Sequence, residues 1–279
     1  MQLDMFNAWL SNTNRMPLIM GILNVTPDSF SNGGKFSNPH KAIEYALQME
    51  ADGADIIDIG GESTRPGAKP ISFEEETNRV IPVIKGIRKR SNIIISIDTY
   101  KSSIADKAIT VGANIINDIS GMRFDNNMVQ LASKSQVPVV IMHMLGNPQN
   151  MQDNPKYNDL MKDLMLFFQE RISFLKANGI NKKNIILDPG IGFGKTVDHN
   201  FTILRELRRL VDLGFPILVG PSRKSFIGST LNLPPEERIE GTAAAVTAAI
   251  MNGSRIVRIH DVNEMLRVVK VTEKICGIA

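Results

Sequence analysis

Polar side chains stand at one end of the apolar runs in this sequence. The runs are short and rich in Ile, Leu and Val, and their ends carry acids, amides and bases. The residues that end or directly follow a run are Asn24, Glu62, Asp98, Asn117, Asp118, His143, Asp188, Lys224, Arg258 and His260. Because a buried charge is costly unless it is paired and hydrogen-bonded, these ends predict one shared polar site for a small molecule.

Residue spacing sharpens this prediction. Arg258 and His260 are two positions apart, as are Ser96 and Asp98. Residues at i and i+2 of a strand point to the same face, so each pair is expected to share a face.

The alternative is that Asp98, Asn117 and Asp188 only cap the helices that follow them, since Asp and Asn are favoured N-caps. Capping explains any one junction well. It does not explain why polar residues recur at all eight.

Two segments are rich in Gly, Ser, Thr and Pro, and both follow an apolar run. They span residues 25–34 and 60–67, and the second contains Arg65. Loops of this kind can close over a ligand and exclude water. Their backbone N–H groups and hydroxyls, together with Arg65, suit a phosphorylated group.

Several familiar motifs fail here. The glycines of 190–196 resemble a P-loop, but Pro189 stands where its first Gly belongs, and Lys195 breaks a dinucleotide-binding fingerprint. We interpret the segment as a tight loop that brings Phe193 close to a planar ligand. Ser222 lacks the spacing of a nucleophile elbow. The four His residues are too dispersed to predict a metal site from sequence.

The elements that must position these residues alternate regularly. Apolar runs of the kind found in buried parallel strands are separated by amphipathic stretches of helical periodicity. The runs are Leu18–Asn24, Asp55–Ile59, Ile93–Asp98, Asn114–Asp118, Val137–Met142, Asn184–Asp188, Pro216–Val219 and Arg255–Ile259. The helices are expected near Ala42–Asp52, Phe73–Lys89, Leu160–Asn178, Asn200–Leu213 and Glu264–Ile275.

Eight βα units without a composition break predict an α/β fold, a single (β/α)8 TIM barrel. The catalytic barrel is expected over residues 17–279, with a short N-terminal extension over 1–16. The alternative is an open, doubly wound sheet. In a barrel, the polar strand ends would meet at the mouth, where barrel enzymes keep their chemistry.

Composition excludes several other classes of protein. The chain has 279 residues, 43% hydrophobic and 22% charged, which is typical of a globular domain and not of a disordered one. A net charge of +3 and the absence of a long basic run argue against nucleic-acid binding. The single cysteine allows no internal disulfide. The N-terminus lacks signal-peptide features and no apolar stretch is long enough to span a membrane, so we expect a cytoplasmic protein.

Eight short segments taken together resemble the dihydropteroate synthase family. They occur in the same order over nearly the whole chain, and no functional position departs from the family pattern. The segments are Gly21–Phe30, Asp58–Gly67, Ser96–Thr99, Asn117–Gly121, Met142–Met144, Asp188–Lys195, Gly220–Lys224 and Arg258–His260. The resemblance implies condensation of 6-hydroxymethyl-7,8-dihydropterin diphosphate with 4-aminobenzoate, with Mg²⁺ as cofactor and a homodimer as the usual assembly.

The resemblance also implies a role for each matching residue. For the pterin edge, it points to Asp98, Asn117 and Asp188, with Lys224 on the pterin carbonyl and N5 side. Arg258 would lie over the ring and reach the diphosphate with His260, and Asn24 would sit by Mg²⁺. Further substrate contacts are implied for Ile119, Met142 and Phe193, for Thr64 and Arg65 near the diphosphate, and for Phe30, Pro66 and Ser225 near the aminobenzoate.

Two other functions are weighed against this one. A pterin-binding barrel that transfers methyl groups to a corrinoid would share the pterin-edge acids, but it has no use for a diphosphate-binding first loop. A non-catalytic pterin-binding paralogue is expected to have lost loop residues, and no such loss is visible.

Overall fold

The strands close into a parallel barrel in the computed structural model, which describes residues 1–12, 14–26, 39–65 and 67–278. Within these residues the strands number eight and follow the order β6-β5-β4-β3-β2-β1-β8-β7. A parallel bridge between Leu187 and Ile217 joins the two ends of this sheet. The predicted (β/α)8 barrel is therefore confirmed, and the alternative of an open sheet is wrong. The strands are β1 (Leu18–Asn24), β2 (Ile56–Gly60), β3 (Ile94–Asp98), β4 (Ile115–Asp118), β5 (Val139–Met142), β6 (Ile185–Asp188), β7 (Leu218–Val219) and β8 (Ile256–Ile259).

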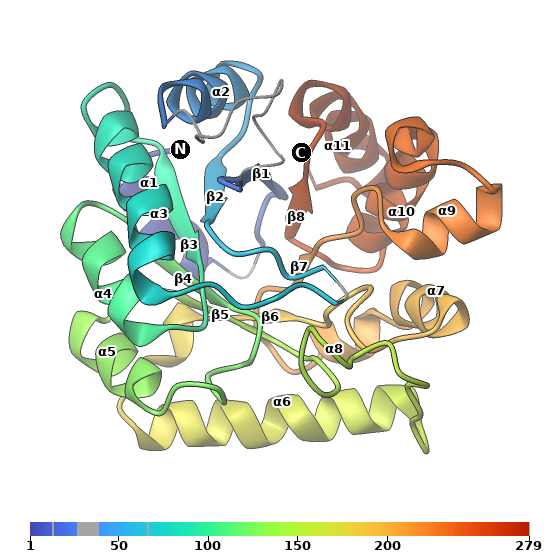
Figure 1. Cartoon of the computed structure of the whole chain (residues 1–279). Helices are drawn as coiled ribbons and strands as arrows, with labels where there is room; N and C mark the ends of the chain where they lie inside the picture. The colour runs from blue at the N-terminus through green and yellow to red at the C-terminus, as the bar shows by residue number, and fades with distance from the viewer. Residues whose placement is uncertain (13, 27–38, 66, 279) are drawn as a thin grey trace.

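Helices surround the barrel, as Figure 1 shows, with α6 lying along one side. The α-helices are α1 (Leu3–Ser11), α2 (Pro39–Ala51), α3 (Phe73–Arg88), α4 (Ser102–Thr110), α5 (Asn127–Ser135), α6 (Leu160–Ala177), α7 (Val197–Arg205), α8 (Arg208–Val211), α9 (Ser225–Leu231), α10 (Ile239–Met251) and α11 (Val262–Cys276). Two short 3-10 helices are η1 (Lys182–Asn184) and η2 (Pro235–Glu237). None of the helices within the described ranges is long and apolar enough to cross a membrane.

The helix expected over Asn200–Leu213 is in fact two helices, α7 and α8. Between them, Arg209 N–H donates to the Glu206 carbonyl and Leu210 N–H to the Leu207 carbonyl, which are tighter three-residue turns. Apolar side chains at Leu207 and Leu210 keep the spacing of a continuous helix and are both buried. Periodicity therefore does not mark this break.

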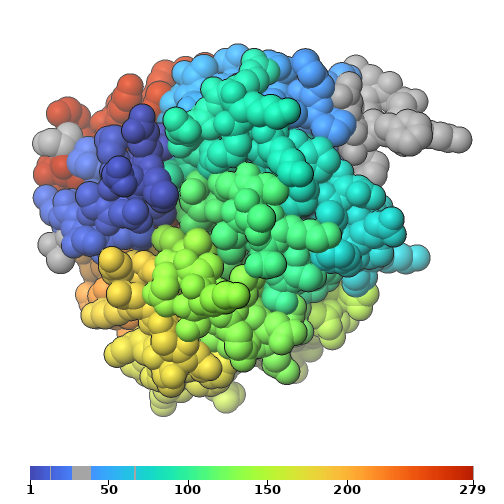
Figure 2. Space-filling view, turned by 90° about the vertical axis from the view of Figure 1, so that its left-hand side faces the viewer, coloured from blue at the N-terminus to red at the C-terminus, as the bar shows by residue number. Residues whose placement is uncertain are grey.

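Helix α1 lies in the predicted N-terminal extension and seals the floor of the barrel. Its Phe6, Trp9 and Leu10 are buried, and the Phe6 and Trp9 rings stack with centroids 5.7 Å apart. They belong to one apolar cluster with the lower inward-facing strand residues Leu18, Met20, Ile56, Ile94, Ile115, Val140, Ile186, Leu218 and Ile256. Figure 2 shows the N-terminal segment in blue, beside the yellow segment that contains η1.

Candidate active site

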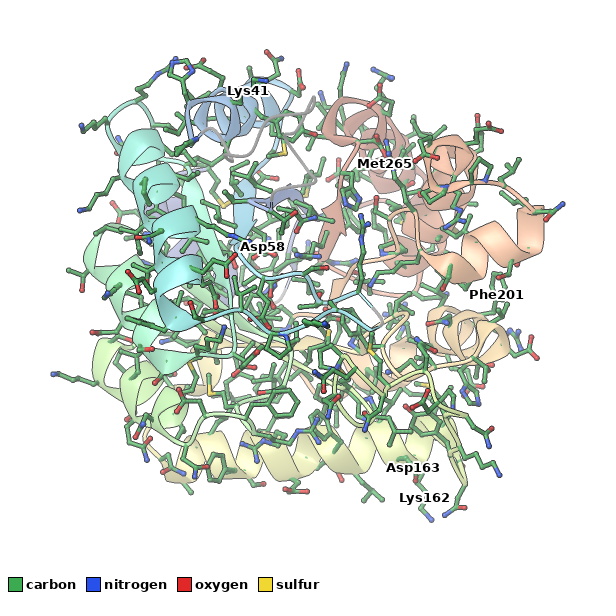
Figure 3. All side chains as sticks on the ribbon, viewed as in Figure 1. Lys41, Asp58, Lys162, Asp163, Phe201 and Met265 are labelled. Atoms are coloured by element: carbon green, nitrogen blue, oxygen red, sulfur yellow. The ribbon has the colours of Figure 1, made fainter. Side chains whose placement is uncertain are left out.

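The layer above this apolar floor is polar, and strand alternation produces it. Residues two positions beyond Ile56, Ile94, Ile115, Ile186 and Ile256 share their inward face. Those residues are Asp58, Ser96, Asn117, Asp188 and Arg258. In Figure 3, Asp58 lies inside the ring of helices, whereas Lys162 and Asp163 stand at the outer end of α6.

Arg258 is the centre of the layer. Its Nε donates to Asp58 Oδ2 at 2.6 Å, and its Nη2 donates to Asp98 Oδ2 at 2.7 Å. Although burial favours the neutral guanidine, Asp58 and Asp98 hold the pKa of Arg258 above its ordinary value. The residue therefore remains a cation pinned between two carboxylates.

Burial raises the pKa of two acids in this layer. Desolvation raises the pKa of Asp98 to about 7, because burial outweighs the attraction of Arg258. Burial likewise raises the pKa of Asp188, whose Oδ1 accepts the Gly190 N–H at 2.7 Å. Asn117 Nδ2 donates to Asp58 Oδ2 at 3.1 Å. These side chains present carboxylate and amide groups that can bind an edge of N–H donors.

Lys224 is a further cation of the polar ring. It is the N-cap residue of α9, and its Nζ lies 4.2 Å from the centroid of the Phe193 ring. Desolvation lowers the pKa of Lys224 to about 8, with Arg258 also acting to lower it. Phe193 is thus beside the Lys224 ammonium group, and its contact with a planar ligand stays a prediction.

The loop that carries Phe193 needs a glycine at its start. Gly190 has a φ of +70°, and an added Cβ atom would lie 2.0 Å from the His143 carbonyl oxygen. Any other residue would therefore be strained and would clash with the backbone after β5. This close approach presses the loop against the neighbouring strand end.

His260 forms a contact with Ser222. The Ser222 Oγ and His260 Nδ1 are 3.0 Å apart, and burial together with Arg258 lowers the pKa of His260 to about 4. His260 is therefore neutral at pH 7. Of its two ring nitrogens, Nε2 is the one left to act on a ligand.

Apolar side chains line the wall next to the acids. Ile119, Met142, Met144 and Met151 form a small buried cluster, against which Phe193 packs. The structure therefore brings the three predicted apolar contacts, Ile119, Met142 and Phe193, together with one another. A flat aromatic ligand fits such a slot, because its faces are apolar while its edge is polar.

Four further predicted residues, Asn24, Thr64, Arg65 and Ser225, lie at the rim. Asn24 ends β1, and its Oδ1 would lie 3.8 Å from a Cβ atom added at Gly60. Thr64 is partly buried in the loop after β2, and Arg65 and Ser225 are exposed. Among the described residues, the side chains of these rim residues form no hydrogen bond with Arg258, Asp58 or Asp98. Phe30 and Pro66 lie outside the described residues.

Sequence reasoning missed Asp58 as a site residue. It lies within β2 rather than at its end, whereas the prediction rests on the ends of the apolar runs. The usable signal is a single acid, two positions after Ile56, inside an otherwise apolar strand.

The pair of Lys195 and His143 was also missed. Lys195 Nζ donates to the Phe193 carbonyl at 2.9 Å and lies 3.1 Å from His143 Nδ1. Burial lowers the pKa of Lys195 to about 7 and, together with Lys195, that of His143 to about 2. The pair ties the Phe193 loop to the end of β5. The spacing of the two residues along the sequence does not predict this contact.

A metal would find few protein ligands here. In the ranges that the structure describes, no group of three or more His, Cys, Asp or Glu side chains is arranged to hold an ion. Asn24 offers one amide oxygen, of the type that Mg²⁺ accepts. Mg²⁺ commonly binds through one or two protein oxygens plus substrate phosphates and water, so a phosphorylated ligand would have to supply most of the shell.

Comparisons of the sequence and of the structure with known proteins point to the same family. A family model described as pterin-binding enzyme matches residues 20–260. The chain is 50% identical over 256 residues to the dihydropteroate synthase of Bacillus subtilis, covering 92% of this chain and 87% of that protein. Among solved structures, it is similar to the Yersinia pestis dihydropteroate synthase in complex with a sulfonamide drug (TM-score 0.90, 44% identity, 96% of each chain). It is also similar to the Xanthomonas albilineans dihydropteroate synthase with 4-aminobenzoic acid (TM-score 0.88, 40% identity, 94% of each chain).

Proposed function

This chain belongs to the pterin-binding enzyme family and is a dihydropteroate synthase, and from that premise we propose which residues of the barrel mouth perform the reaction. The reaction joins 6-hydroxymethyl-7,8-dihydropterin diphosphate to 4-aminobenzoate and releases diphosphate and 7,8-dihydropteroate. The observation that carries the assignment is the polar ring at the barrel mouth, in which Asp58, Asn117 and Asp188 are buried and Asp98, Lys224 and Arg258 are partly buried.

The acids and Lys224 bind the pterin edge. A pterin presents an amino-pyrimidine edge of N–H donors beside one carbonyl group, and carboxylates accept from donors whereas an ammonium donates to a carbonyl. Asp98, Asn117 and Asp188 take the donor edge, and Lys224 takes the carbonyl and N5 side. Ile119, Met142 and Phe193 contact the apolar faces of the ring.

The bond that breaks joins the pterin methylene carbon to the bridging oxygen of the diphosphate. Its electron pair leaves with the diphosphate, so positive charge develops on the methylene and spreads into the ring. The buried carboxylates, pinned in place before reaction, stabilise this charge. The aromatic amine nitrogen then forms the new C–N bond and loses one proton. No covalent intermediate with the protein is needed.

Cations and donors on the opposite side receive the leaving group. Arg258 lies over the ring and reaches the diphosphate, and neutral His260 can donate to it through Nε2 when its Nδ1 accepts from the Ser222 hydroxyl. Thr64 and Arg65 approach it from the loop after β2. Their positions at the rim, outside the buried ring, support this division between a pterin pocket and a diphosphate side.

Mg²⁺ is the proposed cofactor, with Asn24 as its protein ligand. One protein oxygen is compatible with an ion held mainly by the diphosphate. When bound, Mg²⁺ supplies charge neutralisation for the departing diphosphate.

The proposed aminobenzoate contacts are Phe30, Pro66 and Ser225, of which Ser225 alone lies in the described residues. It begins α9, directly after Lys224. This adjacency supports a second substrate bound next to the pterin pocket.

The proposed assembly is a homodimer. Analytical ultracentrifugation tests it: a species of about twice the 30.9 kDa chain mass is expected, and a monomer at micromolar concentration would contradict the proposal.

One assay tests the reaction. Protein, Mg²⁺, the dihydropterin diphosphate and 4-aminobenzoate are mixed, and diphosphate and dihydropteroate are measured together. Equal amounts of both products are expected. No aminobenzoate-dependent release of diphosphate would refute the assignment, and tight pterin binding without turnover would indicate a non-catalytic paralogue. In the variant Asp98→Asn, we expect a folded protein without activity; full turnover would show that the charge of Asp98 is not needed for the reaction.

A further inference from the structure

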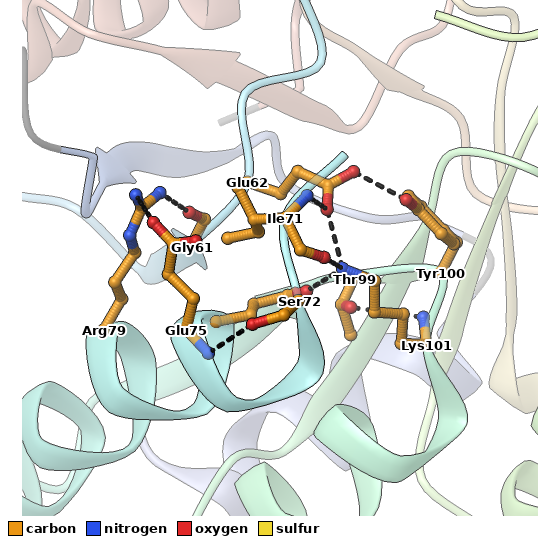
Figure 4. Close-up of polar contacts among 10 residues, drawn as sticks. Gly61, Glu62, Ile71, Ser72, Glu75, Arg79, Thr99, Tyr100 and Lys101 are labelled. Carbon is orange, nitrogen blue, oxygen red and sulfur yellow. Dashed lines mark hydrogen bonds and ion pairs between the residues drawn. The ribbon is translucent and has the colours of Figure 1, made fainter. Parts of the chain in front are cut away.

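A largely buried ion cluster closes the base of the loop that carries Thr64 and Arg65. We call it the loop clasp and define it as Glu62, Glu76, Tyr100 and Lys101. Figure 4 shows the contacts of Glu62 with Tyr100 and Lys101. Glu62 belongs to the loop, Glu76 to α3, and Tyr100 and Lys101 to the segment after β3. The clasp therefore joins three separate parts of the chain.

Both carboxylate oxygens of Glu62 are used. Its Oε1 accepts from the Tyr100 hydroxyl at 2.6 Å. Its Oε2 accepts from Lys101 Nζ at 2.6 Å and from the Ile71 N–H at 3.0 Å. Glu62 thus links the first part of the loop to its last part, nine residues later, as well as to the strand end.

Lys101 is equally committed. Its Nζ donates to Glu62 Oε2, to Glu76 Oε2 at 2.7 Å and to the Ile71 carbonyl at 2.8 Å. All three ammonium protons therefore have acceptors. Burial works against the charged amine, but the two carboxylates prevail and raise the pKa of Lys101.

The charged side chains of the clasp are largely shielded from solvent. The side chains of Glu62 and Glu76 are 9% and 1% exposed, and that of Lys101 is 19% exposed. Removing one partner of such a group leaves the opposite charge uncompensated, which is far more disruptive than breaking a surface ion pair. The two ends of the loop are thereby fixed, and Thr64 and Arg65 follow Glu62 by two and three residues.

The other end of the clasp adjoins the pterin pocket. Asp98 is the last residue of β3, and Tyr100 and Lys101 follow it by two and three residues. One short segment therefore sets Asp98 on one side and holds the loop on the other.

We propose that Glu62 and Lys101 are positioning residues. They fix where the loop that carries Thr64 and Arg65 lies relative to the pterin pocket. This inference rests on the proposed function, in which Thr64 and Arg65 receive the diphosphate. Neither clasp residue touches substrate. They act through the loop, so their loss is expected to impair the use of the diphosphate substrate and to spare binding of the pterin ring.

The test compares Glu62→Gln and Lys101→Met with wild type. Glu62→Gln keeps the size of the side chain and removes its charge, whereas Lys101→Met keeps most of the length and removes the ammonium. For both, kcat/KM for the dihydropterin diphosphate is expected to fall on the order of 10- to 100-fold, the range that follows displacement of a substrate-positioning group. The Kd for 6-hydroxymethylpterin, which lacks the diphosphate, is expected to change less than about threefold, well under the loss in kcat/KM.

The matched control is Glu206→Gln, which breaks an exposed ion pair with Arg209, outside the clasp. Its kcat/KM is expected to equal that of wild type. A double variant, Glu62→Gln/Lys101→Met, should be no worse than the more impaired single variant, because both changes open the same clasp. If Lys101→Met does not fold, Lys101→Arg and Glu62→Gln provide the comparison, and Lys101→Arg is expected to retain more activity than Glu62→Gln.

The outcomes separate the two levels of inference. A wild type without turnover would contradict the proposed function itself. An active wild type with equally active clasp variants would overturn the positioning role. A parallel loss of pterin binding and kcat/KM would also overturn it, because the clasp would then support the whole barrel mouth rather than the loop.

Discussion

Replacing Asp58 by Asn is the sharpest test of how the site is held together. Asp58 is fully buried, and its Oδ2 accepts from both Arg258 Nε and Asn117 Nδ2. The Asn variant keeps the volume and one acceptor oxygen but removes the negative charge. Arg258 then keeps Asp98 as its charged partner.

The size of the effect follows from these contacts. A hydrogen bond to a charged group contributes about 1.5–3 kcal/mol, and removing one partner of a buried ion pair costs about 3–5 kcal/mol. Because Asp98 still compensates Arg258, we expect the lower range, about 1.5–3 kcal/mol. If this loss falls on the transition state, kcat/KM drops on the order of 10- to 100-fold.

Steady-state kinetics and calorimetric unfolding of the same preparation measure the two consequences. Ser96→Ala is the matched control, because Ser96 pairs with Asp58 in the register of β2 and β3 and is equally buried. Its Oγ has no hydrogen-bond partner in the described part of the chain. The control should therefore have near-wild-type activity. Wild-type kinetics and stability in Asp58→Asn would refute the argument and leave Asp98 as the sole anchor of Arg258.

Three further predictions concern pH, the barrel floor and the metal. The pKa of Asp98 is raised to about 7, so the carboxylate that accepts the pterin N–H groups is lost below that pH. Pterin affinity should fall up to about tenfold per pH unit below 7, and equal calorimetric affinities at pH 6 and 8 would contradict this. The raised pKa of Asp98 also means that the folded protein binds this proton more tightly than the unfolded chain does. The resulting stabilisation of the fold is complete below the pKa of Asp98 in the unfolded chain and is lost as the pH rises through about 7. Trp9→Ala should lower the free energy of unfolding by about 3–5 kcal/mol in denaturant titrations while the active fraction keeps its kcat; unchanged stability would mean that α1 does not support the floor. Asn24→Ala should raise the Mg²⁺ concentration needed for half-maximal activity without weakening binding of 6-hydroxymethylpterin, and an unaltered Mg²⁺ dependence would remove Asn24 from the metal shell.

Much of the fold and of the site could be predicted because both depend on local patterns. Runs of Ile, Leu and Val identify buried parallel strands, and eight of them interspersed with helices determine a barrel. The strand ends then converge, which is why the amino-acid sequence alone predicts that Asp98, Asn117 and Asp188 lie together. The i and i+2 pairing of Ser96 with Asp98 also follows from alternation alone.

What could not be predicted depends on contacts between distant segments. Asp58 is 200 residues from Arg258, and the clasp joins Glu62, Glu76 and Lys101 from three elements. Spacing along the chain carries no information about such meetings. Helix α1 is a different case, because Phe6, Trp9 and Leu10 have helical spacing, which is a usable signal within the segment predicted only as an extension.

The floor of the barrel also has a spectroscopic consequence. Trp9 is the only tryptophan of the chain, and its indole Nε1 donates to the Met16 carbonyl at 2.7 Å, at the end of the barrel opposite the strand carboxyl ends. Its intrinsic fluorescence therefore reports on the packing of the floor, out of contact with a ligand bound at the mouth. One optical signal can thus follow unfolding in the presence of substrate, separately from the events of catalysis.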